Sequence, residues 1–420
     1  MTGSLVVFSL TYLVIAGGRL AFLKLDRPGA ALVGAAAMVV VGGLPLDAAL
    51  HAIDLHVIVL LFAVLVIAGH LREARVFELA ADLVLTRTRS PRALLFGLTF
   101  VAGGLSALLV NDTVCVVLTP LVVAVALEAR LPVLPFLLAL AGAANVGGVV
   151  SFSGNPQNMI IGAAAHGTVG FAAYLVLVLP AGAACLAANA WLLSWLFRRE
   201  LAAHALGPRN VTPINIDRLL ALESLAALAL FAGLALAGVE LAGAAMAAAA
   251  LLIAVGRTGK RALAGVDWPL LAFFAGLFVV VAGVAHTGVL DRMFEAVAPI
   301  VARGDLAGDA AFVALVVIAS QLVSNVPLVL VAVAWIPRMP SPAWGYVMLA
   351  VASTLAGNLT LFGSIANIIV VESAGEHGKI GFRTFLRYGA ILTAVDLAIA
   401  FGLLALERAI GEPGWLGLAL

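Results

Sequence analysis

Four groups of small polar residues interrupt the otherwise apolar sequence of this 420-residue chain. The groups combine asparagine with serine, threonine or glycine, which break helices and leave backbone amides and carbonyls free. Their candidate binding residues are Asn111, Asp112 and Thr113; Asn145, Gly148, Ser151, Ser153, Asn155 and Asn158; Ser324 and Asn325; and Thr354, Asn358, Thr360, Ser364 and Asn367. Freed carbonyls and side-chain oxygens can coordinate a small cation, and the starts of half-helices can bind an anion.

Asp112 is the single acidic residue of the four groups. An acid within an apolar segment indicates a functional role, so Asp112 is the expected coupling residue, which exchanges a proton for substrate or sodium. Glu223 and Asp396 also lie in apolar segments but away from the polar groups, and they are alternatives. If sodium is the coupling ion, the expected ligands are Asn111, Asn158, Asn325 and Asn367. The other interpretation of each group is a packing surface in which polar side chains join helices.

The composition places these groups in a membrane. Hydrophobic residues make up 64% of the chain and charged residues 11%, whereas soluble domains carry about 25% charged residues. Lipid must cover this much apolar surface. Segments long enough to cross a bilayer lie at about 4–25, 29–46, 54–70, 134–164, 168–197, 218–238, 241–256, 267–285, 343–371 and 384–407. Segments 71–90 and 286–305 mix charged and apolar residues and are expected to lie at the interface.

Two further apolar regions, 92–130 and 310–337, are interrupted by the polar groups at 111–113 and 324–327. The first region would be about 58 Å long as one helix, nearly twice the membrane core, so it must fold back. Polar groups also interrupt segments 134–164 and 343–371. We therefore expect an all-α polytopic membrane protein with about ten transmembrane helices, two re-entrant helical hairpins and two broken helices.

The chain also repeats itself. A shift of 213–214 residues brings Asp54 onto Asp267, Ser106 onto Ser320 and Asn111 onto Asn325, and a shift of 209 brings Asn158 onto Asn367. The predicted units are a first repeat at 1–200, a cytoplasmic linker at 201–216 and a second repeat at 217–420. Each repeat has five crossings, so the second copy is inverted relative to the first, which is typical of secondary transporters.

Lys and Arg predict the orientation. The connections around 19–27, 72–92, 130, 198–218, 257–261 and 379–387 hold 19 of the 23 Lys and Arg residues. The positive-inside rule places these connections in the cytoplasm and both termini outside. The location expected is the cytoplasmic (inner) membrane of a bacterial-type cell.

These motifs resemble the ion transporter superfamily, which includes divalent anion symporters, citrate-type permeases and the arsenite permease ArsB. Residues 111–113 and 324–326 resemble its hairpin tips, and the run from Gly147 to Asn158 resembles its first broken helix. Asp112 at the first tip and Asn325 followed by Pro327 at the second are most similar to bacterial anion permeases of the arsenite-permease type. The resemblance covers nearly the whole chain and implies an elevator, in which tips and broken helices move past a static scaffold.

The favoured function is secondary transport of a small anion or oxyacid, coupled to protons or sodium, with arsenite or antimonite efflux as the most specific version. A dicarboxylate or citrate symporter or exchanger, a cation/proton antiporter and an anion channel are the alternatives. The sequence contains no catalytic or metal-binding motif that would indicate an enzyme. No cofactor is expected other than a coupling ion, and the net charge of +1 argues against nucleic acid. The lipid bilayer is an expected partner. Both a monomer and a homodimer remain possible oligomeric states. An arsenite pump would need a separate ATPase subunit, because the sequence contains no P-loop motif.

Overall fold

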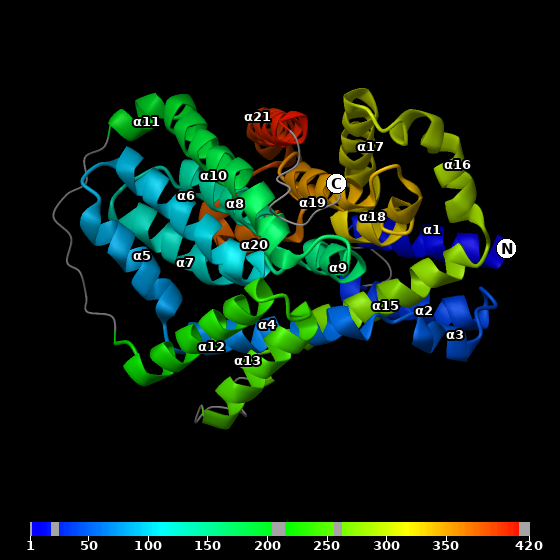
Figure 1. Ribbon diagram of the computed structural model, residues 1–420. Coiled ribbons are helices and arrows are strands. Elements are labelled where there is room, and N and C mark those ends of the chain that lie inside the picture. Colours follow the sequence, from blue (N-terminus) through cyan, green and yellow to red (C-terminus); the bar gives the residue numbers. More distant parts are fainter. Residues whose placement is uncertain (1, 18–24, 204–214, 256–262, 411–420) are drawn as a thin grey trace.

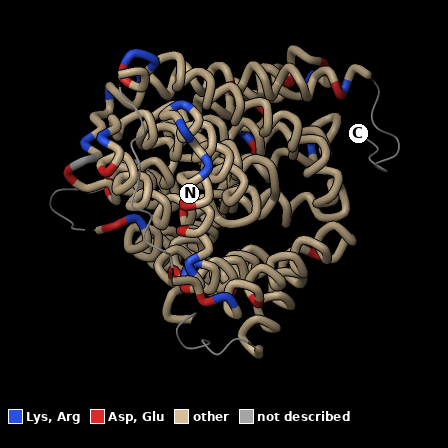
Figure 2. The backbone as a smooth tube through the Cα atoms, turned by 90° about the vertical axis from the view of Figure 1, so that its left-hand side faces the viewer, with Lys and Arg blue, Asp and Glu red and all other residues tan. Residues whose placement is uncertain are grey.

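The computed structural model describes residues 2–17, 25–203, 215–255 and 263–410, and within these ranges it contains helices and no strand. Eight of the described helices are long and apolar enough to cross a membrane, and five shorter apolar helices accompany them. In Figure 2, long uncharged stretches of backbone separate the charged positions. The expected all-α polytopic membrane fold is confirmed.

The two halves of the chain present the same order of helices. The first half contains α1 (Thr2–Gly17), α2 (Arg27–Val40), α3 (Leu46–His51), α4 (Leu55–Glu73), α5 (Val76–Arg87), α6 (Pro91–Leu108), α7 (Asn111–Glu128), α8 (Val133–Val149), α9 (Pro156–Ala164), α10 (Phe171–Leu196) and α11 (Arg198–Ala202). The second half contains α12 (Arg218–Leu236), α13 (Leu241–Val255), α15 (Trp268–Ala285), α16 (Val289–Val301), α17 (Leu306–Val323), α18 (Asn325–Ala332), α19 (Pro342–Ala356), α20 (Ile365–Ser373) and α21 (Phe382–Ala409). The clearest counterparts are α9 and α20, which are both nine residues long and start 209 positions apart.

Contacts at the helix ends show that the halves have opposite orientations. The Ser4 hydroxyl donates to the Gly42 carbonyl, which puts the start of α1 beside the end of α2. Ala74, just after α4, packs against Leu220 in the first turn of α12. Because α2 and α4 are successive crossings, α1 begins at the face where α4 begins, and α12 begins at the face where α4 ends. The counterparts α1 and α12 therefore start on opposite faces, as the inverted repeat requires.

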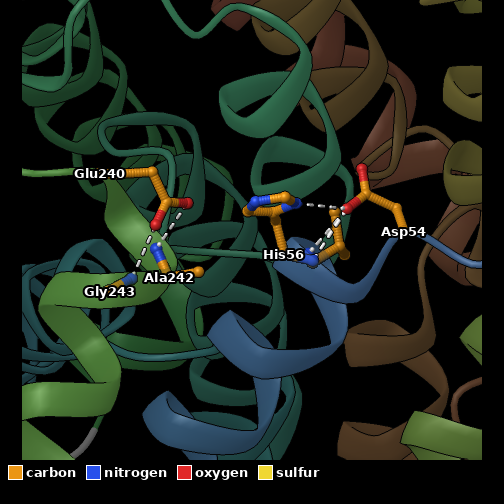
Figure 3. A network of polar contacts seen from close by, with 6 residues as sticks. Asp54, His56, Glu240, Ala242 and Gly243 are labelled. Atoms are coloured by element: carbon orange, nitrogen blue, oxygen red, sulfur yellow. Dashed lines mark hydrogen bonds and ion pairs between the residues drawn. The ribbon is translucent and has the colours of Figure 1, made fainter.

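Acidic residues start the central helices of both halves. The Asp26 carboxylate accepts from the Gly29 amide at 2.8 Å, and its counterpart Glu240 accepts from the Gly243 amide at 2.8 Å. Asp54 caps α4 in the same way, at 2.9 Å from the His56 amide. Such caps satisfy amides that have no partner within the helix and oppose the helix dipole. Figure 3 shows the capped first turns of α4 and α13, two helices that pack against each other.

The helices form two layers. In Figure 1, α2, α4, α12, α13 and α15 make a band across the lower part of the molecule. Other long helices lie above it, with α6, α7, α8 and α10 on one side, α17 and α19 on the other, and α21 between them at the top. Within the band the halves interlock, because α2 packs on α15 and α4 packs on α13. The short helices α9, α18 and α20 lie between these groups.

Some predicted ends differ from the structure. The span expected at 4–25 is helical from Thr2 to Gly17, and residues 18–24 lie outside the described part. The expected linker 201–216 starts within α11, and residues 204–214 lie outside the described part. The second hairpin is asymmetric, because α18 ends at Ala332 after eight residues, whereas α7 runs for eighteen. At eighteen residues each, α6 and α7 are long enough to cross the membrane, so helix length leaves their re-entrant path a prediction.

Candidate functional site

The polar groups lie at four helix breaks. Only Leu109 and Val110 separate α6 from α7, so that Asn111 and Asp112 open α7. Only Ser324 separates α17 from α18, and its positive φ of 70° turns the chain there. The other breaks lie between α8 and α9 and between α19 and α20. Four helices (α7, α9, α18 and α20) thus start directly after a break.

One asparagine closes the backbone at each broken helix. The Asn158 side-chain amide donates to the carbonyls of Gly148 at 3.0 Å and Ser151 at 3.1 Å. Its counterpart Asn367 donates to the carbonyls of Gly357 at 2.7 Å and Thr360 at 3.0 Å. All four acceptors are carbonyls that a continuous helix would satisfy, and leaving one buried without a partner is costly. The two asparagines therefore stabilise the breaks.

The two broken helices also bond to each other across the repeat. The Asn145 side-chain amide donates to Asn367 Oδ1 at 3.0 Å, and the counterpart of Asn145, Thr354, donates its hydroxyl to Asn158 Oδ1 at 3.3 Å. Asn145 donates as well to Asn358 Oδ1 at 2.8 Å. These residues are buried. The breaks of the two halves thus hold each other in register.

Further bonds attach the hairpin tips to this centre. The Asn111 side-chain amide donates to Asn145 Oδ1 at 3.1 Å, and its backbone amide donates to the Gly154 carbonyl at 3.0 Å. The Ser151 hydroxyl donates to the Ala107 carbonyl at the end of α6. In the second half, the Thr360 hydroxyl bonds to Gln321 Oε1 at 2.9 Å, near the end of α17. Tips and broken helices therefore form one connected polar network.

Glycine allows this close packing. A Cβ atom at Gly147 would lie 2.0 Å from the Gly103 carbonyl oxygen of α6, whereas a Cβ at Gly142, on the same helix, would meet only side-chain atoms at 3.8 Å or more. A backbone carbonyl cannot move aside as a side chain can. Glycine at 147 is therefore required for α8 to approach α6.

A small cavity of about 20 Å³ lies where the tips meet the starts of α9 and α20. It is lined by Ile15, Arg27, Asn111, Asp112, Pro156, Gln157, Phe273, Ser324, Asn325, Val326, Pro327, Gly363, Ser364 and Ile365. Residues of α1, α2 and α15 close it from the side of the lower band. The cavity thus lies between the band and the broken helices.

The cavity carries positive potential and one acid. The four helices α7, α9, α18 and α20 all turn their first residues to it, and helix starts carry unpaired amides and a partial positive charge. Arg27 adds a guanidinium and Asp112 a carboxylate, and Arg27 and Asp267 are the charged groups that act on Asp112. Asn325 Oδ1 is buried without a hydrogen-bond partner among the described residues. The site therefore offers donors and acceptors to a single small ligand.

The structure divides the predicted site residues into two sets. The residues that line the cavity are Asn111, Asp112, Ser324, Asn325 and Ser364. The residues that brace the breaks and tips behind it are Asn145, Gly148, Ser151, Ser153, Asn155, Asn158, Thr354, Asn358, Thr360 and Asn367. Thr113 lies in the first turn of α7, outside the cavity lining.

The four asparagines expected around sodium are separated in the same way. Asn111 and Asn325 line the cavity, whereas Asn158 and Asn367 use their amides on the broken helices. No group of three or more His, Cys, Asp or Glu residues that could hold a metal ion occurs within the described ranges. If sodium binds, the cavity offers it two of the four predicted ligands.

Arg27 and Gln157 are lining residues that were absent from the predicted set. The sequence places Arg27 in the basic connection 19–27, which the positive-inside rule assigns to the cytoplasm. Its position directly before Pro28, at the start of an apolar span, indicates a residue in the first turn of that helix. Gln157 belongs to the second polar group and could have been included with its neighbours.

Comparisons with known proteins agree with this architecture. The chain is 31% identical to the silicon efflux transporter LSI3 of Oryza sativa subsp. japonica, over 95% of this chain and 96% of that protein. It is 31% identical to an uncharacterized transporter of Mycobacterium tuberculosis, over 94% and 95%, and 23% identical to the putative transporter arsB of Dictyostelium discoideum, over 91% and 88%. The crystal structure of the YdaH transporter of Alcanivorax borkumensis has a similar fold, with a TM-score of 0.58, 18% identity and 98% coverage of both chains.

The family assignment follows from a match over most of the chain. The profile of the citrate transporter family, CitMHS, matches residues 12–344, a range that includes both hairpins and the first broken helix. The family and the relatives named above are transporters and not enzymes, as the absence of catalytic motifs predicted. The chain is a membrane transporter that belongs to the citrate transporter family, within the ion transporter superfamily.

Proposed function

We propose that this transporter is a secondary active carrier of a compact oxyacid or small anion. The observation that supports this best is the convergence of four helix starts, Arg27 and Asp112 on one cavity. Helix starts and arginine bind oxygen anions, because their N–H groups donate and their charge is positive. The Asp112 carboxylate and the free Asn325 oxygen add acceptors for a ligand that carries hydroxyl groups.

An oxyacid matches this mixture better than a fully ionised anion does. Arsenite, antimonite and silicic acid present O–H donors as well as oxygen acceptors, so they can bond to Asp112 and to the helix amides together. The cavity, at about 20 Å³, is little larger than the ~10–15 Å³ that one water molecule needs. The names of two relatives, a silicon efflux transporter and an arsB-type transporter, point to the same chemistry. Efflux of such an oxyacid is therefore the favoured function.

The second candidate is transport of a dicarboxylate or citrate. It is favoured by the description of the matching family, and a carboxylate could lie between Arg27 and a helix start. This ligand would have to widen the cavity and displace or neutralise Asp112. The two candidates therefore predict opposite effects of removing the acid.

Coupling is assigned to Asp112, which lines the cavity and can accept a proton when the oxyacid leaves. Sodium is the alternative coupling ion, with the side-chain oxygens of Asn111 and Asn325 as ligands. An arsenite pump driven by ATP would need a separate ATPase subunit.

An elevator movement fits the position of the cavity. Arg27 and Phe273 belong to helices of the lower band, whereas the tips and broken helices form one bonded unit. We assign the band to a static scaffold and the bonded unit to the moving part, in a cytoplasmic membrane with both termini outside. The cavity would then lose its scaffold wall as the unit moves. Thr113 is half-buried beside the cavity-lining Asp112, in the first turn of α7. A cysteine there should react with an impermeant reagent in one conformational state and be shielded in the other, and equal reaction in every state would contradict the movement.

The test is a ligand screen of the purified full-length protein by thermal shift. Arsenite, antimonite, silicic acid, phosphate, sulfate, succinate and citrate are compared with and without sodium. We expect the three weak oxyacids to raise the unfolding temperature, and Arg27→Gln to reduce that rise, while the exposed control Arg292→Gln keeps it. Stabilisation by citrate or succinate alone would support the second candidate. A sodium requirement would replace the proton as the coupling ion.

A further inference from the structure

A second buried acid lies behind the cavity, on α21. Asp396 is fully buried, and its Oδ2 accepts a hydrogen bond from the Asn189 side-chain amide of α10 at 3.1 Å. Its backbone carbonyl accepts from the Cys185 thiol at 3.4 Å. By the repeat, Cys185 is the counterpart of Asp396, since α10 and α21 start 211 residues apart. The acid therefore lies where the two halves meet, and only the second half supplies it.

Two side-chain oxygens at this acid have no donor. Asp396 Oδ1 and Asn189 Oδ1 are both buried without a partner among the described residues. Two buried acceptor oxygens without donors are unfavourable, and a carboxylate makes the deficit worse. A proton on Asp396 supplies the missing donor. The acid and the Asn189 amide can then pair, with each group donating once and accepting once.

No charged side chain is available to balance a carboxylate here. The helices that pack against α21 in this region are α8, α10 and α19, and none of them contains Asp, Glu, Lys, Arg or His. Their titratable groups are Cys185 and Tyr174 of α10 and Tyr346 of α19. On α21 itself, Tyr388 and the exposed Arg387 lie more than two turns away, and the exposed Arg383 is further along. Glu407 lies three turns away on the other side, and Arg408, one residue beyond it, pairs with Asp309. A transient carboxylate must therefore be balanced by a mobile proton or by movement of the helices.

A chain of asparagines connects the acid to the transport site. The Asn358 side chain approaches the Asp396 carboxyl group, and its Oδ1 accepts from Asn145. Asn145 Oδ1 in turn accepts from Asn111, which opens α7 directly before Asp112. Loss of the proton from Asp396 would leave a carboxylate that attracts the Asn358 amide group. Such a change in Asn358 would be transmitted through Asn145 to the first tip.

We propose that Asp396 is a second proton-binding site, coupled to the substrate cavity through Asn358 and Asn145. Its role in coupling rests on the proposed transport function, whereas proton binding itself does not. Protonation forms one O–H bond at the Asp396 carboxyl group, with the proton taken from water and returned to water in each cycle. Asp112 would then act next to the substrate and Asp396 behind the broken helices.

Infrared difference spectroscopy after a pH jump tests proton binding without a substrate. The full-length protein in lipid is compared with Asp396→Asn, with the rescue variant Asp396→Glu and with Asp112→Asn. We expect one carboxylic-acid C=O band to be lost in Asp396→Asn, to persist at a shifted frequency in Asp396→Glu and to remain in Asp112→Asn. A spectrum of Asp396→Asn identical to that of the unmodified protein would overturn the proposal. The Glu variant keeps the test valid if the Asn variant folds poorly.

Coupling is then measured in proteoliposomes with arsenite as the probe, as pH-driven flux beside counterflow. We expect Asp396→Asn to lower pH-driven flux at least tenfold while counterflow persists, and Asp396→Glu to restore most of it. Full pH-driven flux in Asp396→Asn would overturn the coupling role even if the infrared band is assigned. If the unmodified protein carries no arsenite, the proposed function fails, and the infrared result still decides proton binding.

Discussion

The two halves of the molecule close their broken helices in the same way but differ in charge at their hairpin tips. Asn158 and Asn367 close equivalent carbonyls with nearly the same distances. At the tips, however, Asp112 of the first half corresponds to the apolar Val326 of the second. The shared feature is the hydrogen bonding of the freed carbonyls, which any chain that breaks a helix inside a membrane must provide. The tip residues are not needed for this hydrogen bonding and can differ between the halves. A transporter needs that difference in tip residues, because both copies of the repeat face one ligand.

The largest effects on transport are expected when the asparagine that closes a broken helix is removed. Asn158→Ala and Asn367→Ala each leave two carbonyls without their donor, which costs about 1–3 kcal/mol for each buried group. We expect transport to fall more than tenfold in both variants, with a lower unfolding temperature but a folded protein. Arsenite counterflow and thermal unfolding measure the two effects.

The matched control is Ser224→Ala, which removes a hydroxyl bonded to a carbonyl within the unbroken helix α12. It should leave transport unchanged. Normal transport in either asparagine variant would show that the two breaks are not equivalent in function, whatever their geometry.

The next effect concerns the unequal tips. Asp112→Asn keeps the shape of the side chain and removes its titration, so pH-driven flux should fall about tenfold or more while counterflow persists. Val326→Asp gives the second tip the acid of the first, and two carboxylates in one cavity should weaken binding of anionic ligands. Full pH-driven flux in Asp112→Asn would remove this residue from coupling and leave Asp396, Glu223 or sodium in its place.

A smaller effect should separate Asn145 from its counterpart Thr354, the two residues that bond across the repeat. Asn145 uses both atoms of its side-chain amide, at 2.8–3.1 Å, to bond to Asn111, Asn358, Asn367 and Ser364. Thr354 has one hydroxyl for its longer bonds, at 3.2–3.4 Å, to Asn155, Gln157 and Asn158. We expect roughly tenfold slower transport in Asn145→Ala and roughly threefold in Thr354→Val. Equal losses, measured as initial rates of counterflow, would mean that the crossing bonds contribute alike and that Asn145 is no hub.

The smallest effects are expected at the helix caps of the band. Asp54→Ala and Glu240→Ala remove the side chains that cap α4 and α13 (Figure 3), and each should lower stability by about 0.5–2 kcal/mol. Transport at saturating substrate should stay within twofold of the unmodified protein, because neither residue lines the cavity. A larger loss of transport would show that the band moves with the substrate and is no static scaffold.

Much of the fold follows from sequence patterns that lipid imposes. Apolar length predicted the crossings, and polar interruptions at 111–113 and 324–327 predicted where α6 and α17 end. The offset of 209 residues predicted that Asn158 and Asn367 are counterparts, and their bonds are equivalent. Helix ends were less accurate, as α18 shows, because apolar residues continue beyond its last turn at Ala332.

The division of the site could not be predicted in the same way. An asparagine at a helix break can face the cavity or bond to the backbone behind it. The residue type alone does not tell which of these two roles it has. Asn325 does the first and Asn367 the second. Arg27 reaches the cavity because α2 packs on α15 of the other half, a contact between residues far apart in the sequence. The sequence of α2 by itself does not indicate that this helix packs on α15.

The most direct test of the central claim is arsenite counterflow in proteoliposomes that contain the purified protein. Vesicles loaded with unlabelled arsenite receive a trace of labelled arsenite outside, without a pH gradient. We predict transient accumulation of label above the equilibrium level, which the cavity variants Arg27→Gln and Asn325→Ala reduce at least tenfold and the exposed control Arg292→Gln leaves intact. Equal accumulation in the two cavity variants and the unmodified protein would contradict the assignment of the substrate to the cavity between the hairpin tips.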